Sequence, residues 1–296
     1  MRSNRRKFFL GLLAVLSVTP VWSAADTKSE GLTAEQIAER HVAARGGLAA
    51  WRAVQTMSWA GKMEANSGNS VARSKAYVAQ MWDKRSPTAR GAALQAAEKD
   101  EAANPPVAKA VELPFVLEMK RPGKSRIELE FAGKTAIQVY DGKQGWMKRP
   151  YLNRDDWEAF SAEQAKASVG AWNMDGPLID YAAKGAKLAL EGVDKVDGSD
   201  AYKLKVTHKD GVVQHVWIDQ KSFLDVKVEG TPRRMDGKLR SVWVLQRDFR
   251  EVEGGVRIPF AQETAVEGYR ETHKVRLEKV AVNPKLDDVL FVKPGA

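Results

Sequence analysis

The histidines are the first residues to consider for metal or acid–base chemistry. The chain has four of them, His41, His208, His215 and His273, and none stands in a short metal-ligand motif. His208 and His215 are predicted to lie diagonally on one face of a hairpin, where a metal pair is geometrically conceivable. No third ligand is evident, because Asp219 lies too far along the strand. A histidine hydrogen-bonded at the rim of a sheet is the simpler interpretation, so we expect no metal and no cofactor.

Paired charged residues are the second candidates for chemistry. Asp155-Asp156 and Asp287-Asp288 are adjacent carboxylates, but the first pair is explained by a predicted helix start, where negative charge is favoured. Arg233-Arg234, in a predicted loop over 231–237, is a candidate to bind a lipid phosphate or carboxylate, although a solvated turn is the simpler interpretation. The sequence has no nucleophile elbow, phosphate-binding glycine loop or dinucleotide fingerprint. No catalytic residue can be assigned, and we expect a protein that is not an enzyme.

The N-terminus has the pattern of a bacterial export signal. Four positive charges in residues 2–7 precede the apolar run Phe8 to Val18, and Ser23-Ala24-Ala25 offers a cleavage site. The apolar run is too short for a membrane span; a retained N-terminal anchor is the alternative. Residues 4–10 also resemble a twin-arginine signal, so export by either the Sec or the Tat route stays open. We predict a signal peptide over residues 1–25, a single domain over 26–296, and a periplasmic location.

The net charge and the lack of cysteine exclude several classes of partner and of covalent modification. Removing residues 1–25 removes four positive charges, so the formal net charge of +9 falls to +5 in the remaining 271 residues. This mild surplus makes nucleic acid an unlikely partner and leaves a weak preference for anionic membrane surfaces. The absence of cysteine excludes disulfides, thiolate metal sites and a lipid-modified N-terminal cysteine. We therefore expect a soluble protein after signal cleavage.

The stretch from Pro114 to Arg149 has the clearest pattern in the chain. Apolar and polar residues alternate with the period of a strand that has one dry face. Pro122-Gly123 and Asp141-Gly142 stand between the apolar runs, where glycine supplies the positive φ of a tight turn. Three or four antiparallel strands in succession are predicted here, as the centre of a meander.

Further strands are predicted on both sides of this meander. Residues 202–219 read as a hairpin; if Asp210-Gly211 forms a two-residue turn, Leu204 faces Trp217 and Val206 faces His215. The other predicted strands cover residues 54–65, 71–82, 224–229, 238–249, 257–265 and 269–281. The expected fold class is mainly β (α+β), a half-open antiparallel β-barrel of roughly 10–11 strands.

Helices are predicted at three places. Thr33 and Gln36 form a capping box before an amphipathic helix over residues 34–45, followed by a short second helical piece. A helix over 155–168 and another piece from Pro177 to Gly185 are expected to lie across the face of the sheet. Residues 83–113, rich in Ala, Lys and Glu, are predicted to form a flexible, solvated insertion, with a mobile flap over a ligand site as the alternative.

Several separated features resemble the periplasmic lipoprotein-carrier superfamily, the LolA/LolB-like outer-membrane lipoprotein-sorting proteins. They are the first helix ending in Gly46-Gly47, followed by Trp51 and the first strand; the Asp141-Gly142 turn before Trp146; the helices inserted midway; and the C-terminal stretch 280–291 followed by Pro294. The resemblance implies a half-open barrel whose concave apolar face, covered by an N-terminal helix and inserted helices, holds lipoprotein acyl chains or senses lipid.

This resemblance and the dry sheet face together lead to a functional hypothesis. We expect a periplasmic carrier or binding protein for a lipid or for lipoprotein acyl chains, with an inner- or outer-membrane protein as a further candidate partner. The alternative is an envelope lipid-sensing or protein-interaction module, and for any single cavity residue the alternative is a core role. The candidate cavity residues are Met57, Trp59, Met63, Leu117, Met119, Leu129, Phe131, Leu204, Val206 and Trp217, with Trp157, Phe160 and Ile179 from the lid.

Overall fold

The fold is that of a computed structural model, which describes residues 31–66, 110–162, 164–165, 174–235, 237–269 and 272–293. The residues from Thr33 onward belong to one compact unit. The signal peptide over 1–25, the strand over 71–82 and nearly all of the 83–113 insertion lie outside the described residues. No helix in the described part of the chain has the length and apolarity needed to cross a bilayer.

The N-terminal helix forms as the sequence predicts. Helix α1 (Ala34–Ala44) begins after a capping box, in which the Thr33 side chain accepts from the Gln36 backbone and the Gln36 side chain accepts from the Thr33 backbone. Ile37 is fully buried on its apolar side. A second, shorter helix, α2 (Leu48–Ala53), follows directly.

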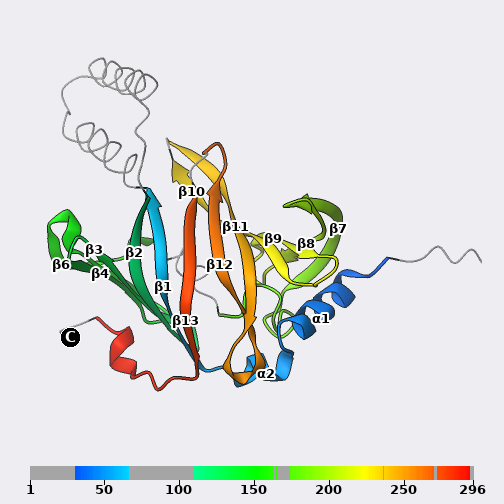
Figure 1. The fold of residues 1–296 in the computed structure, drawn as a ribbon, viewed down its shortest axis with the longest axis horizontal. Coiled ribbons are helices and arrows are strands. Elements are labelled where there is room, and N and C mark those ends of the chain that lie inside the picture. The colour runs from blue at the N-terminus through cyan, green and yellow to red at the C-terminus, as the bar shows by residue number, and fades with distance from the viewer. Residues whose placement is uncertain are drawn as a thin grey trace, which may run out of the picture. The chain divides into compact units, whose positions relative to one another are not determined.

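A single antiparallel sheet of thirteen strands makes up most of the described structure (Figure 1). The strands are β1 (Thr56–Asn66), β2 (Ala110–Lys120), β3 (Lys124–Phe131), β4 (Lys134–Tyr140), β5 (Gly145–Arg149), β6 (Arg154–Ala159), β7 (Lys187–Val196), β8 (Ser199–Thr207), β9 (Val213–Asp219), β10 (Asp225–Met235), β11 (Lys238–Glu251), β12 (Arg257–Val266) and β13 (His273–Val282). Three short 3-10 helices, η1 (Pro150–Leu152), η2 (Glu253–Gly255) and η3 (Asp288–Phe291), lie between or after them.

Two meanders share this sheet. One runs from β1 to β6 and the other from β7 to β13, and they join where β1 pairs with β13, side by side in Figure 1. The strand order ends at β6 and β7, so the sheet is not closed. The predicted fold class, a mainly antiparallel and half-open β structure, is confirmed, although the sheet has more strands than the roughly 10–11 expected.

Two segments that were predicted as helices have other conformations. The first part of the segment predicted as a helix over 155–168 is strand β6 (Arg154–Ala159), because Ala159 pairs with Trp146 of β5 and the Phe160 amide donates to the Gly145 carbonyl at 2.8 Å. Only the described residues after Ser161 turn helically. Asp155 and Asp156 are therefore exposed strand residues and not a helix start.

The second segment is a series of turns over residues 174–185, here called the strap. A positive φ of 56° at Asp180 prevents a continuous helix through it. After Asp180 a single helical turn forms, and Gly185, with a φ of 76°, ends it as the sequence predicts. In the described residues an edge strand, a helical turn after Ser161 and a strap of turns thus stand where the inserted helices were expected. Residues 166–168 of the first predicted helix lie outside the described part.

The β8–β9 hairpin is shifted by one residue from the predicted register. Its loop is longer than two residues, since the His208 amide donates to the Val212 carbonyl at 2.8 Å. Leu204 consequently faces Val216, and Trp217 faces Lys203. A shift of one residue moves a side chain to the opposite face, so Trp217 does not share a face with Leu204, contrary to the prediction.

The same shift separates the two histidines that were considered as a metal pair. His208 Nε2 bonds the Gln214 side chain at 3.0 Å, whereas His215 Nδ1 donates to Glu229 Oε2 at 2.5 Å. The described residues contain no cluster of three or more His, Asp or Glu side chains that could hold a metal ion. The other candidate pair, Arg233-Arg234, lies within β10, exposed, and not in a loop.

Helix α1 is held against the second meander by a buried polar contact. His41 is fully buried, and its Nδ1–H donates to the carbonyl of Phe223 at 3.0 Å. Arg45 at the helix end pairs with Asp225 at 2.9 Å, and both side chains are almost completely buried. Burial lowers the pKa of His41 below its ordinary value of 6.5, and nearby Arg45 acts in the same direction, while Asp225 and the Phe223 carbonyl oppose it.

This buried histidine should make stability depend on pH in the mildly acidic range. Because the pKa of His41 is lower in the folded protein, the unfolded chain binds a proton at a pH where folded His41 is still neutral. The free energy of unfolding therefore falls as pH drops below about 6.5. In His41→Asn the amide nitrogen can still donate to Phe223, but nothing titrates. Denaturant unfolding at several pH values should show a smaller loss of stability toward acid for the variant; equal losses would contradict the buried neutral His41.

Candidate functional site

The predicted cavity residues of β1 and β2 lie on one face of the sheet, here called the inner face. In an antiparallel pair, residues directly opposite each other point to the same side. Met57 faces Met119, and Trp59 faces Leu117, while Met63 follows Trp59 and Gly61 by strand alternation. The register therefore brings these five side chains together as the alternation predicts.

The inner face extends across both meanders. Leu129 of β3 faces Phe115 of β2, and Phe131 follows it by alternation. In the other direction, paired positions run from Met63 across β13, β12, β11, β10 and β9 to Leu204 without a change of face, and Val206 follows Leu204. Nine of the ten predicted sheet residues thus share the inner face, and Trp217 is the exception.

One end of the inner face is filled, and is here called the closed end. Met57 and Leu117 have no exposed surface, and they pack with Trp51 of α2 and with Met174 and Ile179 of the strap. At this end the predicted residues form a hydrophobic core. Ile179 therefore covers the sheet as predicted, although from a strap and not from a helix.

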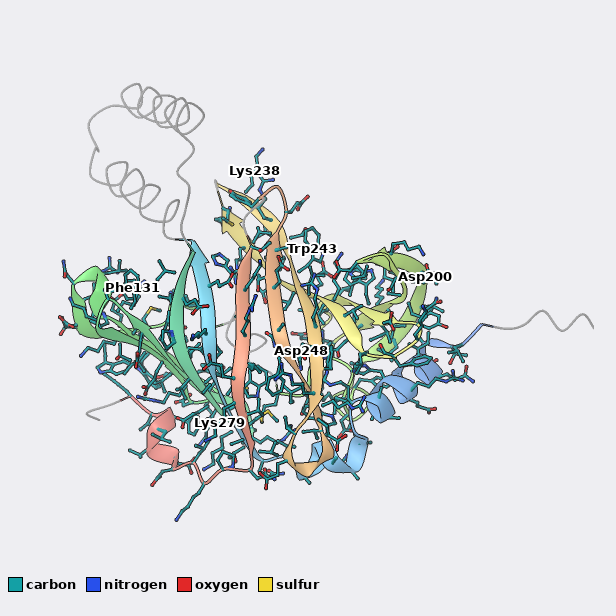
Figure 2. All side chains as sticks on the ribbon, viewed as in Figure 1. Phe131, Asp200, Lys238, Trp243, Asp248 and Lys279 are labelled. Atoms are coloured by element: carbon teal, nitrogen blue, oxygen red, sulfur yellow. The ribbon has the colours of Figure 1, made fainter. Side chains whose placement is uncertain are left out.

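The opposite end is less completely covered, and is here called the open end. Trp59, Met63 and Leu129 are only partly buried, although they pack against the same core. Phe131 is 37% exposed and lies at the end of β3, where Figure 2 shows its ring on the β3–β4 hairpin. A cleft of about 620 Å³ lies beside this end, between β2 and the β3–β4 hairpin. It includes Phe131 but none of Trp59, Met63 and Leu129, and its lining residues are Val111, Glu112, Leu113, Pro114, Glu130, Phe131, Ala132, Gly133 and Thr135. This volume is within the range of small-molecule sites.

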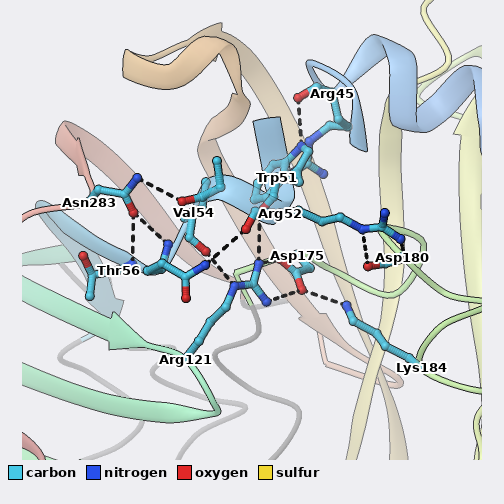
Figure 3. Close-up of polar contacts among 12 residues, drawn as sticks. Arg45, Trp51, Arg52, Val54, Thr56, Arg121, Asp175, Asp180, Lys184 and Asn283 are labelled. Carbon is cyan, nitrogen blue, oxygen red and sulfur yellow. Dashed lines mark hydrogen bonds and ion pairs between the residues drawn. The ribbon is translucent and has the colours of Figure 1, made fainter. Parts of the chain in front are cut away.

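A buried carboxylate anchors the strap at the closed end (Figure 3). Arg121 donates from Nε to the Val54 carbonyl at 2.7 Å and forms a two-point ion pair with Asp175. Lys184 Nζ donates to Asp175 Oδ2 at 2.8 Å. Asp175 is only 3% exposed, and although burial raises its pKa, the bonds from Arg121 and Lys184 outweigh burial and lower the pKa below its ordinary value. The strap is therefore fixed by a charged carboxylate that the sheet itself binds.

A second ion pair fastens the strap from α2. Arg52 donates two bonds to Asp180, at 2.9 and 2.8 Å. This pair is exposed, with 59% of the Arg52 side chain accessible, so solvent screens it and it contributes little to stability. The Arg121–Asp175 pair is accordingly the main polar anchor of the strap.

The C-terminal segment also closes this end of the sheet. The Asn283 side chain accepts from the backbones of Gln55 and Thr56 and donates to the Ala53 carbonyl. Beyond it, Phe291 of η3 is fully buried. Asp287, one of the paired carboxylates considered above, accepts a hydrogen bond from the Val289 backbone at the start of η3. It therefore has a structural role as the cap of this short helix.

The two remaining lid candidates lie at the edge of the sheet. Trp157 is partly buried in β6, and the ring of Phe160 lies over Gly145, where an added Cβ would be 2.0 Å from it. Gly145 is an inner-face position, so Phe160 covers the inner face, from the end of β6 and not from a helix. Trp217, on the outer face, donates from Nε1 to Asp194 at 2.8 Å and lies under Lys227, whose Nζ is 4.2 Å from the ring centroid.

The anchor of the strap was not predicted from the sequence. Arg121 stands before Pro122-Gly123 and was assigned only to a turn, and Asp175 lies 54 residues away along the chain. No short motif links two such positions. The weak signal was the turn sequence Asp175-Gly176-Pro177, which marks a stop in the chain but does not name the partner.

The sequence matches no protein-family model, and comparison with curated proteins finds no match. Solved structures do resemble the fold. One is a LolA superfamily protein from Nitrosomonas europaea, with 15% identity, 88% of this chain and 98% of that chain covered, and a TM-score of 0.50. Another is a DUF1329 family protein from Desulfovibrio piger, with 14% identity, 88% and 97% coverage, and a TM-score of 0.51. The predicted resemblance is confirmed at the level of structure: the chain has the fold of the LolA superfamily.

Proposed function

We propose that this protein is a non-enzymatic periplasmic binding or carrier protein for a lipid or for the acyl chains of a lipoprotein. The fold it shares with a LolA superfamily protein supports the ligand class. The export signal predicted over residues 1–25 supports the location. The acyl chain occupies the open end of the inner face, and the strap covers the closed end.

The observation that carries this proposal is the change in burial along one continuous apolar face. Met57 and Leu117 are fully buried at the closed end, whereas Phe131 is 37% exposed at the open end. An apolar face that is buried at one end and accessible at the other offers a surface on which a hydrophobic ligand can be buried. Methionine and aromatic side chains at the open end suit a flexible apolar ligand, because Met63 adapts its shape readily.

The energy available from such a site is substantial. Each methylene group transferred from water to an apolar surface stabilises the complex by about 0.8 kcal/mol. A long acyl chain therefore needs only partial burial to bind tightly. Entry of a longer chain toward the closed end would require the strap to move away from Met57 and Leu117, and the buried Arg121–Asp175 anchor opposes that movement.

Phe131→Glu should weaken binding of a fluorescent palmitoyl probe by at least about tenfold, because an unpaired carboxylate would face the apolar chain. Val116→Glu is the matched control. Val116 is 39% exposed, close to the 37% of Phe131, but lies in β2 between inner-face residues and so points to the outer face. Both variants should remain folded with modest losses of stability, because Val116→Glu faces Glu128 across β2–β3 and Phe131→Glu loses its ring contact with Tyr151.

The proposal would be wrong if both variants bound the probe as the native protein does. It would also be wrong if the native protein bound no acyl probe at all. Equal loss in both variants would mean that the added charge, and not its place on the inner face, is responsible.

A further inference from the structure

Trp59 carries a hydrogen-bond donor that nothing in the described structure satisfies. Its indole Nε1 is buried and has no partner there. Native proteins leave very few buried polar atoms unpaired, and each one costs about 1–3 kcal/mol. The fully or almost fully buried tryptophans show the usual outcome: Trp51 Nε1 donates to the Arg45 carbonyl at 2.9 Å, and Trp217 Nε1 donates to Asp194 at 2.8 Å. Trp59 is therefore an exception that needs a physical reason.

The other buried polar atoms without a partner in the described structure belong to side chains that have further polar atoms. Arg149 Nε and Glu158 Oε1 are also buried without partners, but these two side chains already bind each other through other atoms at 2.7 Å. Arg240 Nε, the remaining such atom, belongs to a guanidinium that has further donors. Trp59 differs because Nε1 is its one polar side-chain atom, so the whole hydrogen-bonding capacity of the side chain is unused.

The position of Trp59 allows a bound ligand to supply the missing hydrogen-bond acceptor. Trp59 lies on the inner face between Leu117 and Val280, at the transition from the closed end to the open end. Its ring is partly exposed, so a ligand at the open end would reach it after small movements of apolar neighbours. An acyl chain brings one acceptor of its own, the carbonyl oxygen at its head.

We propose that Trp59 Nε1–H donates to the carbonyl oxygen of an ester- or amide-linked acyl chain, and thereby selects such ligands over free fatty acids. The immediate neighbours of Trp59 on this face, Met57, Gly61, Leu117 and Val280, carry no charge. A fatty-acid carboxylate would be buried there without a cation, which is costly, whereas a neutral carbonyl needs only the single donor. This inference rests on the proposed function and adds the chemistry of the ligand's head.

The test compares methyl palmitate, palmitamide and palmitate by displacement of a fluorescent palmitoyl probe. The native protein should bind the two neutral ligands more tightly than palmitate. Trp59→Phe should weaken binding of the neutral ligands by about tenfold, the effect expected for loss of one well-placed hydrogen bond. Trp146→Phe is the matched control. Met147 lies on the inner face, so its neighbour Trp146, which pairs with Val139, points to the outer face.

A spectroscopic readout keeps the test valid even if Trp59→Phe folds poorly. Among the eight indole N–H signals of the labelled mature protein, which lacks Trp22 of the predicted signal peptide, one should move downfield when methyl palmitate is added, as its proton gains an acceptor. That signal should be missing from Trp59→Phe. The inference would be overturned if the neutral ligands bound Trp59→Phe as tightly as Trp146→Phe, or if they bound the native protein without moving an indole signal. The proposed function would remain intact in either case. A native protein that binds none of the palmitoyl ligands would overturn both.

Discussion

Replacing Gly46 with alanine is expected to lower the free energy of unfolding by about 3 kcal/mol or more. Gly46 follows α1 with a φ of 107°, a conformation that L-residues rarely adopt. An added Cβ would lie 2.1 Å from the Gly255 carbonyl oxygen and 2.9 Å from Val256 Cα. Both contacts are with backbone, so no side chain can move aside, and the helix would have to separate from the turn between β11 and β12.

Gly47→Ala is the matched control for this substitution. Gly47 also has a positive φ, of 90°, but an added Cβ would meet nothing within 4 Å. Only the conformational cost applies. With a ψ of 154° Gly47 lies in a region that is almost exclusive to glycine, so we expect a loss of about 1–3 kcal/mol, smaller than that of Gly46→Ala. Denaturant unfolding of both variants measures the difference. Equal losses would show that α1 does not approach the β11–β12 turn as closely as the structure has it.

Replacing Asp175 with alanine is expected to release the strap and to cost about 2–3 kcal/mol of stability, because Arg121 and Lys184 lose the buried carboxylate that they share. Arg52→Ala removes the other, exposed ion pair of the same strap without straining the backbone of Asp180, and should cost less than about 1 kcal/mol. Hydrogen–deuterium exchange should rise across residues 174–185 in Asp175→Ala only, and the palmitoyl probe should dissociate faster from that variant.

The same anchor predicts a response to acid. The pKa of Asp175 is lowered in the folded protein, so its contribution is complete above the ordinary carboxyl pKa and is lost as pH falls through the folded pKa. Strap exchange in the native protein should therefore rise only when the pH falls below about 3.8, the ordinary carboxyl value. Unchanged exchange in Asp175→Ala would show that apolar contacts of Met174 and Ile179, and not the ion pair, hold the strap.

The sequence was sufficient for features that depend on local pattern. Alternation from Pro114 to Arg149 predicted three or four strands where the structure has β2 to β5, and the Thr33–Gln36 capping box located α1. Both signals lie within a few residues of the structure they specify. The inner-face positions of β1, β2 and β3 followed from the same alternation. Their division into a filled end and an accessible end did not, since burial depends on α2 and the strap, which approach from elsewhere in the chain.

The errors have a common cause in contacts that a single sequence does not show. The spacing of Trp157 and Phe160 fits a helix, yet pairing with β5 gives a strand. Asp210-Gly211 is a good two-residue turn, but the longer loop shifts the register and turns Trp217 to the outer face. Strand β7 was not predicted because it is largely exposed and interrupted at Gly192, so its apolar pattern is weak. The unpaired indole of Trp59 likewise has no signature in the sequence.

Native mass spectrometry of the mature protein, purified from the periplasm of the cells that make it, tests the central claim most directly. The account predicts a mass above that of the polypeptide, and organic extraction should release an ester- or amide-linked acyl chain as a lipid or an acylated protein. Detection of the bare polypeptide alone, in a preparation that also fails to bind palmitoyl probes, would contradict the account. The inner face would then be only a core, and an interaction module would be the better interpretation.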